Sequence, residues 1–176
     1  MLKGLVQIYT GNGKGKTTAA LGQGFRSAGR GLKVYMIQFL KSADSGELHS
    51  AEKLEDAFKI FRFESKRDFF WKLNDEQKNE LKKEIGQAFD FAKAVMERKE
   101  CDVLILDEIM GTVNNKLIEE QELCNFIKNK HPSIELIMTG RNAPESVIAL
   151  ADYVSEINAM KHPMEQGIAA REGIEF

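Results

Sequence analysis

The sequence predicts an α/β fold in which a mostly parallel sheet is flanked by helices, as in phosphate-loop NTPases of the RecA-like type. Two observations lead to this prediction. A glycine-rich segment at residues 10–18 follows a short apolar run and precedes a helical run, and short apolar strands then alternate with amphipathic helices. The chain has 176 residues, which suits a single nucleotide-binding domain spanning residues 1–176.

The glycine-rich segment reads Thr10-Gly11-Asn12-Gly13-Lys14-Gly15-Lys16-Thr17-Thr18 and follows an expected strand at residues 5–9. The usual phosphate-loop pattern is G-x-x-x-x-G-K-[ST], and Thr10 takes the place of the first glycine. The glycines Gly11, Gly13 and Gly15 permit a curled backbone whose successive N–H groups point at one spot. A surface turn rich in glycine and lysine is the alternative, but the flanking strand and helix favour a nucleotide-binding loop at residues 11–18.

Lys16 and Thr17 are the loop residues expected to take part in chemistry. The ammonium group of Lys16 brings a full positive charge to the phosphates, and the helix that begins here adds the positive end of its dipole. The hydroxyl of Thr17 is placed to hold a Mg²⁺ that bridges phosphate oxygens. Both are therefore candidate catalytic residues, and Thr17 is also a candidate metal ligand.

The helix after this loop is expected to turn an apolar face toward the sheet and to end at Gly29 and Gly31. That face consists of Ala19, Ala20, Leu21, Phe25 and Ala28. Residues 33–39 predict a strand, which completes a βαβ unit with parallel strands. A short helix is expected at residues 52–57, and the alternating residues 58–63 predict a strand with one wet face.

Two connections carry candidate ligand-binding residues. Residues 40–47, with Lys41, are polar and lie beyond the end of the second strand, where ligands bind in open α/β sheets, although a plain surface loop has the same composition. The second connection contains Phe69, Phe70 and Trp71 among cations. The residues alone leave open whether these aromatic side chains close the edge of the core or form a hydrophobic wall for a large flat ligand.

Asp102-Val-Leu-Ile-Leu-Asp107-Glu108 is the second chemical landmark. Four apolar residues that end in acids predict a buried parallel strand with carboxylates at its C-terminal tip. In a phosphate-loop protein this tip lies beside the Mg²⁺ site, so Asp107 and Glu108 are candidate metal ligands, directly or through water. The alternative is a strand that ends in two acids by chance, and the pairing with the phosphate loop argues against it.

The remaining elements alternate as expected for this fold class. Asn74 or Asp75 can cap a helix that extends to about residue 99. Its apolar stripe consists of Leu81, Ile85, Ala88, Ala92, Val95 and Met96. A helix at residues 119–130, with Leu123, Phe126 and Ile127 inward, precedes a strand at residues 134–139.

The last of these strands delivers Thr139-Gly140-Arg141 to the same sheet edge as the acids. Arg141 can bind a phosphate with two hydrogen bonds, or it can be an exposed turn residue that pairs with a nearby acid. Pro144 begins a short helix that includes Val147, Ile148 and Leu150, and residues 153–157 predict a final strand. The charges and glycines of the tail, residues 158–176, are typical of neither core nor linker.

Composition excludes several classes of partner. The net charge of -2 argues against nucleic acid as an electrostatic partner. The two cysteines form no C-x-x-C pair and the three histidines show no metal-ligand spacing, so a zinc site or a disulfide framework is not expected. No signal peptide precedes the first strand and no apolar run reaches membrane-spanning length, which favours a cytoplasmic protein without a membrane partner.

Taken together, the motifs resemble those of the phosphate-loop ATP:corrinoid adenosyltransferases, which make adenosylcobalamin. The resemblance spans nearly the whole chain in the same order, and Thr10 before the loop is what this family has. The residues that carry it are Gly11 to Thr18, Gln38-Phe39-Leu40-Lys41, Phe69-Phe70-Trp71, Leu106-Asp107-Glu108-Ile109, Thr139-Gly140-Arg141, and Lys161-His162 with Gly167 and Gly173-Ile174-Glu175-Phe176 in the tail.

The resemblance implies that the cobalt(I) of a reduced corrinoid attacks the 5′ carbon of ATP and that triphosphate leaves. It implies Mg²⁺ as cofactor, Glu108 as the acid associated with the metal and a third candidate catalytic residue, and Lys41 and Arg141 near the nucleotide or the corrinoid. Phe69 and Trp71 match the family positions that pack beneath the corrin ring and displace the lower axial ligand of cobalt. The tail, residues 158–176, then belongs to the active site.

The resemblance also implies a reduced flavin or flavoprotein as electron donor and a homodimer. The chain departs from the family pattern in having Ser42, Ala43 and Asp44 where glycines are common. It also begins at its first strand, whereas some members have an N-terminal extension that covers the active site. Two other classes remain to be compared: a phosphate-loop kinase for a small molecule, and a nucleotide-dependent switch or non-catalytic corrinoid carrier.

Overall fold

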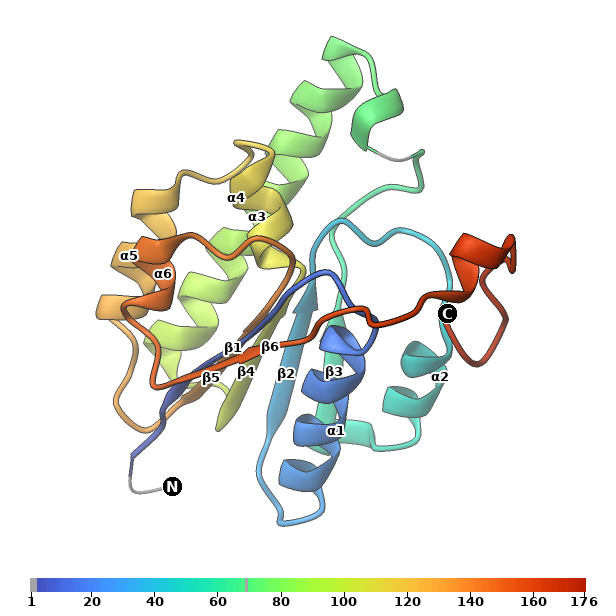
Figure 1. Cartoon of the computed structure of the whole chain (residues 1–176). Coiled ribbons are helices and arrows are strands. Elements are labelled where there is room, and N and C mark those ends of the chain that lie inside the picture. Colours follow the sequence, from blue (N-terminus) through green and yellow to red (C-terminus); the bar gives the residue numbers. More distant parts are fainter. Residues whose placement is uncertain (1–2, 69) are drawn as a thin grey trace.

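The computed structural model describes residues 3–68 and 70–176, and its centre is a parallel sheet of six strands in the order β3-β2-β4-β5-β1-β6. The strands are β1 (Val6–Thr10), β2 (Val34–Gln38), β3 (Phe58–Phe61), β4 (Val103–Asp107), β5 (Glu135–Thr139) and β6 (Tyr153–Glu156). All of the paired strands are parallel, so their C-terminal ends meet at one edge (Figure 1). The predicted α/β class and parallel sheet are confirmed.

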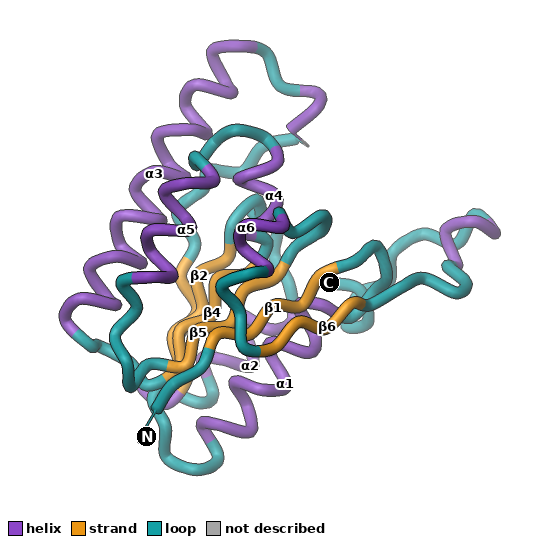
Figure 2. Tube along the Cα trace, turned by 60° about the vertical axis from the view of Figure 1, so that its left-hand side comes forward, coloured by secondary structure: helices purple, strands orange, loops and turns teal. Residues whose placement is uncertain are grey.

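Helices cover both faces of the sheet. On one face lie α1 (Lys16–Ala28) and α2 (Gly46–Glu52), and on the other α3 (Asp75–Arg98), α4 (Ile109–Asn114), α5 (Glu120–Lys128) and α6 (Glu145–Ile148) (Figures 1 and 2). Three short 3-10 turns complete the described elements: η1 (Glu55–Ala57), η2 (Phe70–Lys72) and η3 (Pro163–Gln166). Both faces are thus covered, as an all-parallel sheet requires.

Alternate strand residues serve two separate cores. Leu104 and Leu106 of β4 belong to the larger core, which packs against α3 and α5, whereas Val103 and Ile105 belong to a smaller core beneath α1. The same alternation holds along β2, where all five residues are buried. Continuous apolar runs in these strands therefore follow from burial on both sides.

Helix α3 is stabilised at its start by a capping box. The side chain of Asn74 accepts a hydrogen bond from the backbone N–H of Gln77, and the Gln77 side chain accepts one from the N–H of Asn74. The predicted apolar stripe is buried as expected, and Phe89 joins it. This long helix covers the sheet and positions the aromatic connection that precedes it.

Two predictions about local structure are wrong. The helix expected at residues 52–57 is instead α2, which ends at Glu52, followed by the 3-10 turn η1. The expected apolar face of α1 is wrong at Phe25, which is 66% exposed, whereas Ala20 is buried and Leu21 and Ala28 pack against the smaller core. The other residues buried along α1 are Lys16, Gly24 and Ser27. Small residues face the sheet here because Gly24 lies directly against Phe58, leaving no room for a larger side chain.

In the sheet, one strand separates the strand that leads into the phosphate loop from the strand that ends in the acids. β1 carries the loop and β4 carries Asp107, and β5 lies between them. The C-terminal edge of such a sheet is where ligands bind in open α/β folds. In Figure 1 the aromatic turn η2 lies above this edge and the tail beyond β6 lies to its right.

Candidate active site

The phosphate loop connects β1 to α1 through Gly15, whose φ of 119° lies in the region that favours glycine. Lys16 follows as the first residue of α1, and its side chain is largely buried. Its ammonium group donates a hydrogen bond to the carbonyl of Gly13, 2.8 Å away. Burial lowers the pKa of Lys16, and the nearby charge of Arg141 lowers it further.

The first two glycines of the loop, Gly11 and Gly13, pack against the chain segment that follows β6. A Cβ atom on Gly11 would lie 2.4 Å from the carbonyl oxygen of Ile157, and one on Gly13 would lie 2.8 Å from it. The N–H of Gly13 donates to that same oxygen at 2.7 Å. The expectation that all three glycines turn their N–H groups toward one spot is therefore wrong for Gly13, because the incoming chain after β6 takes this donor.

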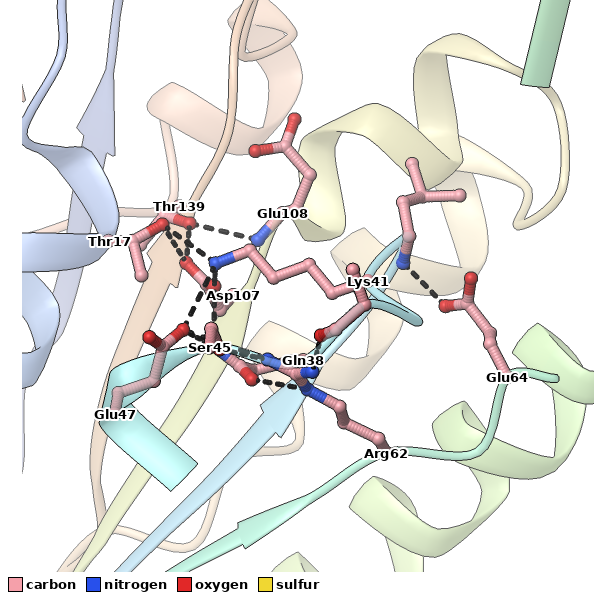
Figure 3. A network of polar contacts seen from close by, with 12 residues as sticks. Thr17, Gln38, Lys41, Ser45, Glu47, Arg62, Glu64, Asp107, Glu108 and Thr139 are labelled. Atoms are coloured by element: carbon pink, nitrogen blue, oxygen red, sulfur yellow. Dashed lines mark hydrogen bonds and ion pairs between the residues drawn. The ribbon is translucent and has the colours of Figure 1, made fainter. Parts of the chain in front are cut away.

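Asp107 is the polar centre of the site, with a fully buried side chain at the tip of β4. One carboxylate oxygen accepts hydrogen bonds from the hydroxyls of Thr139 at 2.6 Å and Thr17 at 2.9 Å. The other oxygen lies 2.7 Å from the ammonium group of Lys41 and 3.3 Å from the amide nitrogen of Gln38 (Figure 3). The carboxylate is thus fully partnered, as a buried charge must be.

Glu108 lies beside Asp107 but points elsewhere. Its backbone has a φ of 60°, and its N–H donates to the hydroxyl of Thr139 at 2.9 Å. Figure 3 shows its carboxylate directed away from Asp107. Burial raises the pKa of Glu108, and the negative charge of Asp107 raises it further. Of the two acids, Asp107 is the one in contact with Thr17.

The polar network continues through residues that the sequence patterns did not indicate. Arg62, just after β3, donates to the side chain of Gln38 at 2.7 Å and to the hydroxyl of Ser45 at 2.7 Å, and it also bonds the carbonyl of Ala43. Glu47 lies 3.7 Å from Arg62. Burial alone would raise the pKa of Glu47, but the hydrogen bond from Gln38, further hydrogen bonds and the charge of Lys41 together outweigh it, and the pKa is lowered. These contacts hold the connection at residues 40–47 against the sheet edge.

Glu64 is a half-buried acid that sequence reasoning missed. Its carboxylate accepts a hydrogen bond from the backbone N–H of Leu40, whose φ of 56° is in the left-handed region. Burial raises the pKa of Glu64 to about 7. No motif could have revealed it, because Leu40 and Glu64 come together only when β2 and β3 pair.

The other predicted nucleotide-binding residues lie around this centre. Arg141 is exposed on the turn after β5, close enough to affect the pKa values of Lys16 and Glu108. Lys14 and Thr18 are exposed, and Asn12 accepts a hydrogen bond from the backbone N–H of Ala159 at 3.1 Å. The loop, Lys41 and Arg141 are therefore gathered at one edge of the sheet.

The aromatic residues before α3 were expected either to close the edge of the core or to form a wall for a flat ligand, and the two described aromatic residues differ in this respect. Phe70 packs against the larger core, and the ammonium group of Lys78 lies 5.7 Å from the centre of its ring. Trp71 is 75% exposed on the turn η2. Phe69, which was also expected to bind the corrinoid, lies outside the described residues. Phe70 thus closes the core edge, and Trp71 offers an aromatic surface to solvent.

The tail continues from β6 alongside the phosphate loop. It surrounds a cavity of about 700 Å³ whose lining includes Lys14, His162 and Arg171. Several of its apolar side chains are exposed: Met160, Met164, Ile168, Ile174 and Phe176. In Figure 2 this segment extends beyond the end of β6, away from the helices on the α3 side.

The protein groups available to a metal are few. Among residues 3–68 and 70–176, no group of three or more His, Cys, Asp or Glu side chains is placed to hold one. Thr17 and Asp107 nevertheless bring two oxygen donors within 2.9 Å of each other, the type of ligand that Mg²⁺ prefers. Phosphate oxygens would have to supply further ligands, as is usual for nucleotide-bound Mg²⁺. None of the described helices is long and apolar enough to cross a membrane.

The family model and the curated relatives that match this chain name the same kind of enzyme. The sequence model of the family described as ATP:corrinoid adenosyltransferase BtuR/CobO/CobP matches residues 2–176. A corrinoid adenosyltransferase from Sinorhizobium sp is 34% identical over 99% of this chain and 81% of its own length. One from Escherichia coli (strain K12) is 31% identical over 99% of this chain and 86% of its own, and one from Salmonella typhimurium is 28% identical over the same shares.

Among solved structures, ATPases 2 and 3 of EssC from Geobacillus thermodenitrificans have a TM-score of 0.45 and 16% identity over 97% of this chain and 35% of theirs. Nothing is inferred from so distant a likeness.

A parallel sheet, a glycine-rich loop that leads into α1, and a buried acid in contact with the loop threonine define a phosphate-loop nucleotide-binding enzyme. Within that class, the chain belongs to the ATP:corrinoid adenosyltransferase family, which the match over residues 2–176 establishes. The resemblance seen in the sequence motifs is thereby confirmed.

Proposed function

We propose that this chain transfers the 5′-deoxyadenosyl group of ATP to the cobalt(I) of a corrinoid and releases triphosphate, giving adenosylcobalamin or a precursor. The observation that carries the proposal is membership of the family over nearly the whole chain. The chemistry of the site agrees with it, because cations and polar groups converge where a triphosphate would lie, and no nucleophilic side chain or general base is needed.

The reaction needs no acid, base or nucleophile from the protein. A cobalt(I) electron pair forms the bond to C5′, the bond from C5′ to the triphosphate oxygen breaks, and the leaving oxygen keeps that pair. No proton moves. Catalysis then depends on alignment of the two substrates and on neutralising charge on the leaving group.

We infer that Lys16 and Thr17, with the remaining N–H groups of the loop, bind the triphosphate. Lys16 suits this role because its ammonium group is held at the loop centre by the Gly13 carbonyl. Arg141 and Lys41 add positive charge from the turns after β5 and β2. Glu108, with its raised pKa, lies at the edge of this cationic region.

We also propose a Mg²⁺ cofactor bound with ATP. Thr17 and Asp107 would contribute oxygen ligands, and Glu108 would contribute through water or after a change of rotamer. The fit is supported by the positive charge that Lys41 already places between Thr17 and Asp107. When bound, the ion would neutralise charge on the triphosphate.

For the corrinoid, we propose that Trp71, together with Phe69, packs beneath the ring and displaces the lower axial ligand of cobalt. Removal of that donor makes cobalt(II) easier to reduce. The exposed ring of Trp71 supports this role, because an aromatic surface of this kind is available to a large flat ligand. A reduced flavin or a flavoprotein would supply the electron.

The proposal extends to the chain as a whole. We propose a cytoplasmic homodimer built from single-domain subunits spanning residues 1–176. The tail, residues 158–176, would form part of the active site, since it is tied to the phosphate loop by the contacts of Ile157 and Ala159.

The test is an anaerobic reaction of the protein with MgATP and chemically reduced cobalamin. We expect the light-sensitive absorption spectrum of an adenosylated corrinoid, and triphosphate formed in a one-to-one ratio with it. ATP that stays intact, or ADP formed without a corrinoid product, would contradict the proposal and favour a kinase or a nucleotide-dependent switch.

A further inference from the structure

The position of Lys41 is unusual for a residue that binds nucleotide. Its ammonium nitrogen lies 2.7 Å from Asp107 Oδ2 and 3.3 Å from Thr17 Oγ1. Glu47 Oε1 lies 3.8 Å away on another side. The side chain of Lys41 is 29% exposed, whereas that of Asp107 is fully buried. One cation therefore bridges the loop threonine and the buried acid (Figure 3).

These two oxygen groups are also the protein ligands proposed for Mg²⁺. A Mg²⁺ ion needs ligand oxygens at about 2.1 Å and strong negative charge around it. The ammonium group of Lys41 already occupies the space between Thr17 Oγ1, 3.3 Å away, and Asp107 Oδ2, 2.7 Å away, so a metal ion that takes the same two groups as ligands has to displace it. Either the metal or Lys41 occupies the position.

We propose that Lys41 is an internal counter-ion that holds the cation position of the nucleotide-free enzyme and is displaced when the metal–nucleotide complex binds. Lys41 is then a positioning residue, since its contact with Asp107 holds that carboxylate beside Thr17. This inference rests on the proposed function, from which the Mg²⁺ is taken. Its consequence is that Mg²⁺ without nucleotide binds weakly, and that metal and triphosphate bind cooperatively.

The surrounding contacts allow Lys41 to move without its neighbours. The backbone before it is fixed by the hydrogen bond between Leu40 and Glu64, and the segment after it is fixed by Arg62 through Ala43 and Ser45. Only the side chain of Lys41 has to leave, and its partial exposure gives it a route toward solvent. There it can pair with a phosphate oxygen of the incoming nucleotide.

The test measures Mn²⁺ binding by electron paramagnetic resonance, with no nucleotide or corrinoid present. Lys41→Met removes the internal cation and leaves Asp107 available, so we expect Mn²⁺ to bind about tenfold more tightly than to the wild-type protein. Lys59→Met is the matched control, because Lys59 pairs with Asp56 on the surface away from the site. It should bind Mn²⁺ as the wild-type protein does. Equal affinities of Lys41→Met and wild type would overturn the inference.

A second measurement does not depend on the folding of Lys41→Met. Reductive ¹³C-methylation keeps the charge of lysine, and the Lys41 signal can be assigned with Lys41→Arg. We expect this signal in the wild-type protein to shift when MgATP is added. A signal that stays unchanged at saturating MgATP would overturn the inference.

These results are independent of catalysis. If adenosyl transfer occurs but Lys41→Met binds Mn²⁺ no more tightly, only the role of Lys41 fails. If Mn²⁺ binding behaves as expected but no adenosylated corrinoid forms, the proposed function fails and the counter-ion role of Lys41 stands.

Discussion

At the scale of single residues, the site is organised around one buried carboxylate. Asp107 has no exposure and is surrounded by donors from four different segments: Thr17, Gln38, Lys41 and Thr139. A buried charge is tolerated only with such partners, because the loss of water has to be compensated by hydrogen bonds and opposite charge. The same residue therefore stabilises the sheet edge and prepares a position for a cation.

Glu64 leads to a prediction about pH. Its folded-state pKa is about 7, against an ordinary value of 4.5, so the folded protein binds more protons than the unfolded chain between these values. The free energy of unfolding should therefore fall as pH rises from about 4.5 to about 7, by about 2 kcal/mol after partial solvent screening. Glu64→Gln keeps the acceptor for the Leu40 N–H and should remove this fall. Urea unfolding between pH 5 and 8 measures it.

The exposed Glu52 supplies the control. Glu52→Gln should keep the pH dependence of the wild-type protein. If Glu64→Gln and wild type lose stability in parallel as pH rises, burial of Glu64 is not the cause of the pH dependence.

Trp71 leads to a prediction about the reduction step. If its ring displaces the lower axial ligand, Trp71→Ala should slow the reaction that starts from cobalt(II) by about tenfold or more. The reaction from pre-formed cobalt(I) should change much less, because reduction is already complete. Anaerobic rates from the two starting states distinguish these effects, and an equal loss from both would exclude the axial-ligand role.

At the scale of elements, the phosphate loop and the tail form one unit. The carbonyl oxygen of Ile157 lies where side chains on Gly11 or Gly13 would collide with it, and it accepts the N–H of Gly13. The glycines of the motif therefore permit close packing of two chain segments, in addition to the turn at Gly15. Thr10, which stands in place of the usual first glycine, ends β1, and its hydroxyl accepts a hydrogen bond from the backbone N–H of Ala143.

Gly13→Ala should separate the tail from the loop. The new methyl group would lie 2.8 Å from the Ile157 oxygen, so the backbone of the tail has to shift. We expect faster tryptic cleavage at Lys161 and Arg171 and weaker binding of ATP by about tenfold. Gly22→Ala is the matched control, because nothing lies within 4 Å of a Cβ at that helical position. Unchanged cleavage in Gly13→Ala would show that the contact does not hold the tail.

At the scale of the whole molecule, the sheet separates two apolar cores of unequal size. The larger core connects β1, β2, β4 and β5 with α3, α4, α5 and α6, and the smaller one lies beneath α1. Because β2 and β4 serve both cores, they hold the acidic tip and the Lys41 connection at fixed positions relative to the phosphate loop. The edge strand β6 is different, since all four of its residues are exposed.

Leu104 tests this division of the molecule. Its side chain is fully buried in the larger core, so Leu104→Ala should reduce the free energy of unfolding by about 2–5 kcal/mol. Val154→Ala on the exposed strand β6 should change it by less than about 1 kcal/mol. Guanidinium unfolding measures both. Similar small changes in the two variants would contradict a central role for β4.

The class of fold and most of the candidate site follow from the sequence alone. Short apolar strands alternating with amphipathic helices predict a parallel sheet, and parallel strands bring their C-terminal tips to one edge. The positions of Lys16, Thr17 and Asp107 near one another therefore follow from local patterns. The stripe of α3 is equally predictable, because its helical period is long and regular.

Only the tertiary structure decided which partners these residues take. Arg62 and Glu64 lie in an ordinary strand and connection, and they become part of the site because β3 pairs with β2. The placement of Lys41 on Asp107, and of the Ile157 carbonyl on Gly13, likewise depends on contacts between distant segments. The sequence determined the kinds of group present and the edge where they gather, whereas long-range pairing determined which charge faces which, because a side chain's partner depends on the neighbouring strand rather than on the neighbouring residue.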